Sequence, residues 1–379
     1  MAQRSLPAVF MRGGTSKGLL LHARDLPLQR DDWGSILVSA MGSPDAYGRQ
    51  LDGMGGGISS LSKVCVIAPP TRDDADVDYT FVQVMIKEAR VDFRSNCGNM
   101  SSAVGPFAYD EGLVTATEGR CTVRIHNTNT HKIIRSTFDV DGPHARYDGA
   151  FVIPGVGTPG SAIRLDFLAP GGATTGHLLP SGNVVDWIDV PGHGPIEVSL
   201  VDAANAVVFV LAHDVGLSGV ELPDELESRQ DVLDLLEALR RAASVRMGIT
   251  ADLTAAAEVT SVPFVAIVAP GRDSPTLSGE VISADDAHLV ARALSNGQPH
   301  RALPLTVSLC TAVAARLRGS VVERLLRVPI PDAIRLAMPS GILEVDADVD
   351  DREGHWVARS GTFFRTARRL FDGRVWYTS

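Results

Sequence analysis

The sequence predicts an α+β protein made of two similar halves. Most of the chain consists of short segments rich in Val, Ile and Phe that are separated by Gly, Pro, Asp and Asn, a pattern typical of β-strands. Helical segments are fewer, and a central helix follows a run of strands once before and once after about residue 185. A chain of 379 residues with 45% hydrophobic content can bury a substantial core, and its length favours two or more domains.

The expected strands are distributed over both halves of the chain. Each is a short apolar run bounded by turn-forming residues. They are Leu6–Met11, Gly18–His22, Lys63–Ala68, Tyr79–Ile86, Cys121–His126, Ile133–Val140, Ile163–Phe167, Ile196–Val201, Val207–Leu211, Val262–Val268 and Ile342–Val345.

The expected helices include one clearly amphipathic segment. They are Asp31–Met41, Cys97–Gly112 with an interruption at Pro106, Pro223–Gly248, Ala284–Ser295, Pro304–Leu317 and Thr366–Phe371. The clearest is Pro223–Gly248, because Val232, Leu235, Leu236 and Leu239 fall on one face of it. Its charged residues fit a solvated outer surface, so we interpret this helix as scaffold.

Composition and charge argue against several classes of function. The net charge of −10 and the lack of a Lys/Arg cluster with interleaved aromatic residues argue against nucleic-acid binding. No apolar run approaches the roughly 18 residues that span a bilayer, and the first residues lack a signal-peptide core. We therefore expect a cytoplasmic protein that binds neither nucleic acid nor a membrane.

The four cysteines lie far apart in the chain. Cys65, Cys97, Cys121 and Cys310 form no C-x-x-C pair and have no partner histidine at zinc spacing. The sequence therefore indicates neither a disulfide framework nor a structural metal site, and we expect reduced thiols.

Cys97 is the most informative residue of the chain. It follows a strand-like run over residues 89–93, precedes the helical run 100–104, and has the polar or small neighbours Asn96, Gly98 and Asn99. Unpaired backbone N–H groups and the positive end of the helix dipole stabilise an anion at such a position, which favours the thiolate. A cysteine is more often a small buried hydrophobe, but the polar neighbours here favour a functional thiol.

Two glycine-rich segments are candidate anion sites. The segment Arg12–Gly18 follows the first expected strand, and its backbone N–H groups can form an anion nest. A hairpin whose glycines supply positive φ angles explains this segment equally well. The second segment, Asp52–Lys63, ends in a lysine at the start of an apolar strand. Neither segment fits a Walker or dinucleotide-binding motif, because the expected helix does not follow.

Lys63 is a candidate acid or base. A lysine at the rim of a buried strand loses hydration, and its amine can then exchange a proton near neutral pH. The commoner fate of a lysine is a solvated head group on an apolar stem, which is the alternative interpretation.

Five motifs that occur in order resemble those of the PrpF-type isomerases. This group includes 2-methylaconitate isomerase, methylitaconate isomerase and 4-oxalomesaconate tautomerase. The motifs are Met11–Gly18, Met41–Asp45, Gln50–Gly56, Ser62–Lys63, and Asn96–Asn99 followed by Val104–Ala108. Weaker similarity continues through Leu179–Asn183 and His300 to Arg365–Leu370, so the resemblance covers nearly the whole chain.

The resemblance implies the diaminopimelate-epimerase-like fold. In this fold two similar domains, related by a pseudo-two-fold axis, each wrap a curved sheet around a central helix, and the active site lies in the cleft between them. We expect one domain over residues 1–185 and the other over 186–354, with residues 355–379 returning to the first. A homodimer is compatible with the sequence but is not indicated by any motif.

The resemblance also implies an isomerase that uses no cofactor and no metal. Its substrate would be a small unsaturated polycarboxylate of the 4-oxalomesaconate, 2-methylaconitate, methylitaconate or aconitate type, in which a proton moves along an allylic system as the C=C bond shifts. The chain has Met338-Pro339-Ser340-Gly341 where relatives often have His-Pro-Ser-Gly, which leaves the choice of substrate open.

The family's catalytic lysine and cysteine carry over to Lys63 and Cys97. Either of them can be the base, with the other as the acid. The residues expected to bind substrate are Arg12, Gly13, Gly14, Thr15, Ser16, Ser60, Ser62, Asn96, Gly98, Asn99, Met100 and His300.

Two alternatives stay open. A cofactor-independent amino-acid epimerase or racemase of the same fold would use one thiol from each half. Pro304 stands at the start of the second central helix instead, and Cys310 lies deeper in that apolar helix, which disfavours this alternative. A non-catalytic carboxylate-binding protein would keep the glycine-rich loops and lose Lys63 and Cys97, whereas both are present.

Overall fold

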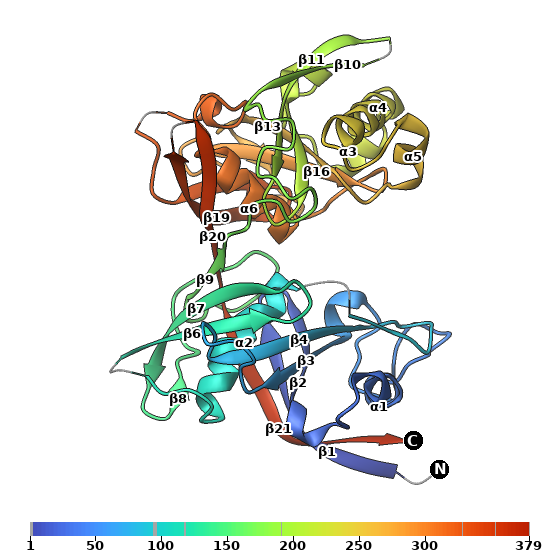
Figure 1. Ribbon diagram of the computed structural model, residues 1–379, viewed down its shortest axis with the longest axis vertical. Coiled ribbons are helices and arrows are strands. Elements are labelled where there is room, and N and C mark those ends of the chain that lie inside the picture. The colour runs from blue at the N-terminus through green and yellow to red at the C-terminus, as the bar shows by residue number, and fades with distance from the viewer. Residues whose placement is uncertain are drawn as a thin grey trace. The chain divides into compact units, whose positions relative to one another are not determined.

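The computed structural model describes residues 3–93, 97–116, 119–190, 192–327, 329–352 and 354–378. The chain forms two compact units, Met1–Phe167 with Phe364–Ser379, and Leu168–Phe363. Each unit contains its own set of paired strands and its own central helix (Figure 1).

The sheet of the first unit has the strand order β21-β1-β2-β3-β4-β6-β7-β9. Its strands are β1 (Gln3–Gly13), β2 (Ser16–His22), β3 (Lys63–Ala68), β4 (Val77–Val84), β6 (Arg120–Asn127), β7 (Lys132–Asp141), β9 (Ile163–Leu168) and β21 (Ala367–Thr378). Two short strands, β5 (Val91–Asp92) and β8 (His144–Ala145), pair with β4 and β7. The pairs β2–β3 and β4–β6 are parallel and the other pairs are antiparallel.

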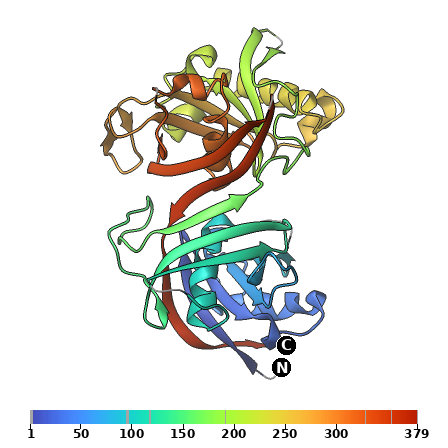
Figure 2. The ribbon, with the colours of Figure 1, turned by 60° about the vertical axis from the view of Figure 1, so that its left-hand side comes forward.

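The central helix of this unit is α2 (Gly98–Asp110), and the sheet curves around it (Figure 2). The helix contacts β1, β2, β3, β6, β7 and β21, and every residue from Met100 to Ala108 is buried. The shorter helix α1 (Trp33–Met41) packs against β21 and β4, and its Trp33, Ile36 and Leu37 join a separate hydrophobic cluster. Strand β3 is buried from Lys63 to Ile67, which explains its continuous apolar sequence.

The second unit repeats this topology with the strand order β10-β11-β12-β13-β16-β18-β19-β20. Its strands are β10 (Asp186–Val190), β11 (Gly194–Asp202), β12 (Ala206–Leu211), β13 (Phe264–Pro270), β16 (Leu289–Ser295), β18 (Ile334–Met338), β19 (Gly341–Arg352) and β20 (His355–Arg365). The pairs β12–β13 and β16–β18 are parallel, at the same two places as in the first unit. The predicted α+β fold with two similar halves is therefore confirmed.

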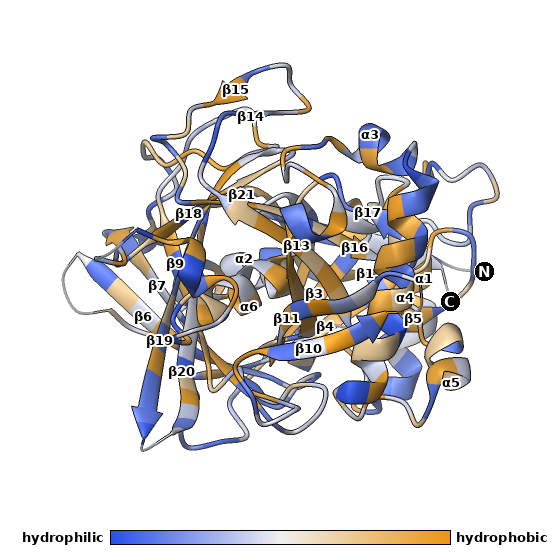
Figure 3. Ribbon diagram, turned by 90° about the horizontal axis from the view of Figure 1, so that it is seen from above, coloured by the Kyte–Doolittle hydropathy of each residue, from blue (hydrophilic) through white to orange (hydrophobic). Residues whose placement is uncertain are grey.

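The helices of the second unit occupy corresponding places in the chain. The central helix α6 (Leu305–Ala314) contacts β11, β12 and β19, and α4 (Gln230–Arg246) packs against β10 and β13. Helix α4 carries both hydrophobic and hydrophilic residues (orange and blue in Figure 3) and buries the predicted Val232, Leu235, Leu236 and Leu239. The remaining elements of the second unit are α3 (Pro223–Glu227), α5 (Leu253–Glu258), β14 (Ser274–Pro275), β15 (Val281–Ile282), β17 (Gln298–Pro299) and the 3₁₀ turns η4 (Ala212–Val215) and η5 (Glu323–Leu325). The first unit also contains the 3₁₀ turns η1 (Ala23–Asp25), η2 (Arg30–Asp32) and η3 (Ser59–Leu61).

Two of the expected helices are wrong, and a third is divided. The segment Ala284–Ser295 contains strand β16, whose residues are all buried between neighbouring strands, so its apolar run reflects a central strand. The segment Thr366–Phe371 leads into β21, where pairing with β1 overrides the local helical preference. The segment Pro223–Gly248 is split into α3 and α4 at Ser228 and Arg229.

The boundary between the units differs from the expected one at residues 185 and 186. Residues 168–185 belong to the second unit, because their backbone is tied to the end of β11. The Gly172 N–H donates to the Asp202 carbonyl, and the N–H groups of Thr174 and Thr175 donate to its carboxylate. The return to the first unit begins at Phe364.

No helix in the described part of the chain is both long and apolar enough to cross a membrane.

We predict that the first unit depends on the packing of α2. Phe107 is 0% exposed in the middle of this helix, so Phe107→Ala should lower the free energy of unfolding by about 3–5 kcal/mol, measured by urea denaturation. Phe371 on β21 is 42% exposed, so Phe371→Ala should cost less than about 1 kcal/mol. Equal losses in the two variants would contradict this account of the core.

Candidate active site

Cys97 is the N-cap residue of α2, which confirms its predicted position just before the helix. Its backbone is extended, with φ −125° and ψ 96°, and its Sγ accepts a hydrogen bond from the Met100 N–H at 3.5 Å. The side chain is 9% exposed. The thiol therefore lies among the first-turn N–H groups of a buried helix, an environment that stabilises an anion.

A neutral buried network lies beneath Cys97. The Ser101 hydroxyl donates to the Cys97 carbonyl at 3.0 Å, and the Cys65 thiol contacts the Tyr79 hydroxyl at 3.8 Å. Burial raises the pKa of Cys65 and that of Tyr79 well above their ordinary values. Both groups stay protonated at neutral pH, so Cys65 does not compete with Cys97 as a nucleophile or base.

Lys63 is the first residue of β3 and is only 9% exposed. Its Nζ donates to the Oε1 of Gln83 at 2.8 Å and lies 4.9 Å from the centre of the Phe81 ring. The prediction of a lysine at the rim of a buried strand is confirmed, and the alternative of a solvated surface lysine is not what the structure shows.

The hairpin between β1 and β2 lies against the first turn of α2. A Cβ atom on Gly13 would come within 2.6 Å of the Asn99 carbonyl oxygen, so only glycine allows this approach. Gly14 adopts a positive φ of +53°. The Nδ2 of Asn99 donates a hydrogen bond to the Thr15 hydroxyl at 3.1 Å. The predicted Arg12–Gly18 hairpin and the Cys97 helix therefore meet, with Ser16 buried at the start of β2.

Two arginines add positive charge beside this turn. The Nη1 of Arg12 donates to the carbonyls of Gly14 and Thr366 at 2.9 and 3.0 Å, and the Nε of Arg365 donates to the Asn99 Oδ1 at 3.1 Å. Burial lowers the pKa of Arg365 to about 10, and burial with the nearby Arg368 lowers the pKa of Arg12. Both remain cations at neutral pH and can attract a carboxylate.

Arg365 is the residue that sequence reasoning missed. The sequence did predict that the C-terminal segment returns to the first domain. It also predicted a helix from Thr366 onward, whereas this segment is a strand paired with β1. The pairing of β21 with β1 carries Arg365 to Asn99.

The second glycine-rich loop is organised around Gln50, which is 1% exposed and has φ +52°. Its Oε1 accepts from the Gly57 N–H at 2.9 Å and from the Ser62 hydroxyl at 2.5 Å. Ser62 is buried and holds the loop together, whereas Ser60 is half-buried on η3. This loop leads directly into Lys63.

The other predicted binding residues have different positions. Gly98 and Asn99 form the first turn of α2, and Met100 follows them with a buried side chain. Asn96 lies outside the described residues. His300 belongs to the second unit, where its Nε2 lies 2.8 Å from the Ser295 hydroxyl and burial lowers its pKa.

The second unit carries different chemistry at the corresponding places. Strand β13, the counterpart of β3, begins with Phe264 in place of a lysine, and Pro304 precedes α6 where Cys97 precedes α2. Cys310 is 0% exposed inside α6. The thiol that a two-thiol racemase needs in this unit is therefore not at the start of α6.

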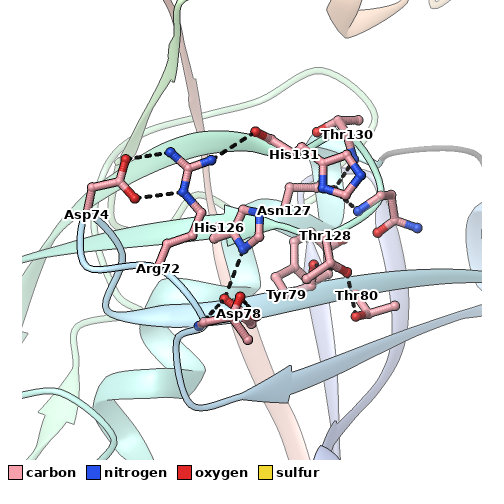
Figure 4. Close-up of polar contacts among 12 residues, drawn as sticks. Arg72, Asp74, Asp78, Tyr79, Thr80, His126, Asn127, Thr128, Thr130 and His131 are labelled. Atoms are coloured by element: carbon pink, nitrogen blue, oxygen red, sulfur yellow. Dashed lines mark hydrogen bonds and ion pairs between the residues drawn. The ribbon is translucent and has the colours of Figure 1, made fainter. Parts of the chain in front are cut away.

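Other polar clusters in the described residues do not form a metal site. No group of three His, Cys, Asp or Glu side chains among them is arranged to hold a metal ion. The polar cluster in Figure 4 includes the buried pair of His126 and Asp78, which are 3.0 Å apart. The Asp78 carboxylate also accepts from the Thr71 N–H and hydroxyl, so this pair fixes a loop to β4.

Comparison with known proteins gives matches over almost the entire chain. A family model described as PrpF protein matches residues 3–378. The 3-methylitaconate isomerase of Eubacterium barkeri is 40% identical over 99% of this chain and 97% of its own length. The 4-oxalomesaconate tautomerase of Pseudomonas putida is 35% identical, with coverage of 99% and 97%. A crystal structure of methylitaconate-delta-isomerase superposes with a TM-score of 0.92 at 39% identity, covering 100% of this chain and 96% of that one.

We predict that Cys97 is the most reactive thiol. Cys65, Cys121 and Cys310 are each at most 1% exposed, and burial raises the pKa of Cys121 to about 11 and that of Cys65 and Cys310 further. These three stay protonated near neutral pH, so iodoacetamide should alkylate Cys97 first, as measured by peptide mass spectrometry over time. Faster labelling of Cys310 would contradict the arrangement described above.

Proposed function

Because this chain belongs to the PrpF family, we propose that it is an isomerase that shifts a C=C bond by 1,3-allylic proton transfer in a small unsaturated di- or tricarboxylate, without a cofactor. The observation that carries the proposal is the match to methylitaconate-delta-isomerase over 100% of the chain at a TM-score of 0.92. Relatives named as isomerases or as a tautomerase share 35–40% of their residues with it over nearly its full length.

The proposed reaction needs two things from the protein. The C–H group between the alkene and an acceptor carbonyl or carboxylate is only weakly acidic in water, so a positioned base must remove its proton and an acid must return one. The dienolate that forms carries additional negative charge, which fixed N–H donors and cations stabilise.

Lys63 and Cys97 are the two groups that we propose for the proton transfer. Lys63 offers an amine held at a strand start, and Cys97 offers a thiol at a helix N-terminus. One acts as base and the other as acid.

The donors around α2 are suited to carboxylates. The first-turn N–H groups of Gly98 and Asn99 present backbone donors, and Arg12 and Arg365 add positive charge. The hairpin N–H groups contribute less than the sequence predicted, because that of Gly14 donates to the Thr366 carbonyl and that of Thr15 to the Asn99 Oδ1. These cations lie in a protein whose net charge is −10, so attraction of an anionic substrate is a local property of this region. His300, in the second unit, stays a sequence-based prediction of a substrate-binding residue.

A substrate panel in D₂O tests the proposed function. We would incubate the protein, after EDTA treatment and dialysis, with 2-methylaconitate, 4-oxalomesaconate, methylitaconate and trans-aconitate, and follow the vinylic and allylic signals by NMR. We expect migration of the double bond in at least one of these acids without added metal, NAD or pyridoxal phosphate. Activity that returns only with one of these additions would exclude the cofactor-free mechanism. A parallel incubation with L-amino acids is the control for the epimerase: exchange of their α-protons, with no change in the four acids, would favour that alternative.

We predict that Lys63 contributes to kcat. Lys63→Ala should reduce turnover by ~10²–10⁴-fold, the usual range for one positioned acid or base. Lys63→Arg should be nearly as damaging, because a guanidinium cannot act as a base near neutral pH. The measurement is steady-state kinetics of both variants, with circular dichroism as the control for folding. If Lys63 only anchors a carboxylate, Arg would restore kcat and the loss would appear in KM.

A further inference from the structure

We propose that Gln83 is a positioning residue that holds the Lys63 amine in its working orientation. This inference rests on the proposed function, in which Lys63 exchanges the proton. The Gln83 side chain is half-buried on β4 and its Oε1 accepts a hydrogen bond from the Lys63 Nζ at 2.8 Å.

The strand register places the two residues opposite each other. Strands β3 and β4 are antiparallel, and Lys63 is paired with Gln83 in the register. Directly opposite residues project from the same face of a sheet, so the strand pairing itself brings their side chains into contact. Phe81 is two residues from Gln83 on the same face, which explains why its ring lies under the Lys63 amine.

The orientation of the Gln83 amide is fixed by its surroundings. Its Nε2 lies 3.1 Å from the Ser59 carbonyl, 3.0 Å from the Ser62 carbonyl and 3.3 Å from the Val84 carbonyl. A flipped amide would place its oxygen against three carbonyl oxygens and its NH₂ group against the lysine amine. Oε1 therefore faces Lys63 and has the role of acceptor.

This arrangement limits the freedom of a long side chain. A lysine has a flexible four-carbon stem, and its amine must be held in place if it is to exchange a proton with substrate. Gln83 takes one of the three Nζ donors and the Phe81 ring covers a second direction. No other hydrogen-bond acceptor of Nζ is found among the described residues, so a remaining donor can face a substrate.

The strand that carries Gln83 is itself clamped. The Asn129 side chain accepts from the Phe81 N–H at 2.8 Å and donates to the Phe81 carbonyl at 2.8 Å, as a neighbouring strand would.

The positions of the second unit that correspond to Lys63 and Gln83 hold no lysine and no glutamine. Phe264 begins β13 and Ser295 ends β16 in these places. The Lys63–Gln83 pair therefore lies in the same unit as Cys97.

A double-mutant cycle tests the inference. Gln83→Met keeps the length and approximate volume of the side chain and removes its polar atoms. We expect it to reduce kcat by about 10–100-fold, less than loss of the acid or base itself, with KM changed by less than about twofold. In a Lys63→Ala background the same substitution should cause no further loss, because the group that it positions is gone. The four enzymes are compared by long-incubation NMR assays.

A structural role for Gln83 gives a different result. If the residue acts only by holding the carbonyls of the loop at residues 59–62, Gln83→Met would reduce kcat by the same factor with and without Lys63, which would overturn the inference. Full activity of Gln83→Met beside an inactive Lys63→Ala would also overturn it while leaving the proposed function intact. An active Lys63→Ala enzyme would instead remove Lys63 from the proposed mechanism and this inference with it.

The matched control is Thr80→Val on the same strand. Thr80 is three residues from Gln83 on β4, so its side chain projects from the opposite face of the strand. Its hydroxyl contacts that of Thr128 at 2.7 Å (Figure 4). Its kcat should stay within about twofold of the parent value, because only one peripheral hydrogen bond is lost. Circular dichroism and thermal unfolding check that each variant is folded.

A second variant covers the case in which Gln83→Met does not fold. Gln83→Glu places a carboxylate beside the lysine amine, and this opposite charge favours the ammonium form. The limb of the kcat pH profile that depends on Lys63 should then move to higher pH by about one unit or more. An unmoved limb in an active Gln83→Glu enzyme would show that residue 83 does not contact the amine during turnover, which would overturn the inference.

Discussion

The close approach of the β1–β2 hairpin to the first turn of α2 is the contact on which the candidate site depends. Gly13 lies so near the Asn99 carbonyl that a Cβ atom would come within 2.6 Å of it. This contact is possible because α2 is buried inside a curved sheet, which fixes its N-terminus relative to the strands. It holds the hairpin next to the helix turn that carries Cys97 and that Arg365 contacts through Asn99. Packing of an apolar helix thus determines the position of polar groups.

The candidate site carries positive charge, although the chain as a whole is acidic. The chain carries a net charge of −10, yet Arg12, Arg365 and Lys63 lie in one unit with buried or half-buried side chains that donate mainly to carbonyl and amide oxygens. Neutral acceptors hold a cation in place without cancelling its charge, so the positive potential remains available to an anion. A polycarboxylate substrate fits this arrangement better than a neutral one.

The two units share one topology and differ in the residues at equivalent places. Parallel pairs occur at the same two positions of each sheet, and each sheet has its own central helix. Lys63 and Cys97 in the first unit correspond to Phe264 and Pro304 in the second. The repeated framework serves packing, whereas the groups that we propose for proton transfer occur in only one copy. This asymmetry separates the proposed isomerase from an enzyme that uses one thiol from each half.

The sequence by itself determined the fold class, the strand that begins at Lys63 and the place of Cys97 at the start of α2, because apolar periodicity and capping are local properties. Resemblance supplied the family. Local patterns failed for residues 284–295 and 366–371, since a buried central strand and a β21 that pairs with the distant β1 are defined by neighbours far away in the chain. Only the tertiary structure brought Arg365 to Asn99 and Gln83 to Lys63. These contacts depend on strand order and register, which no short segment of sequence specifies.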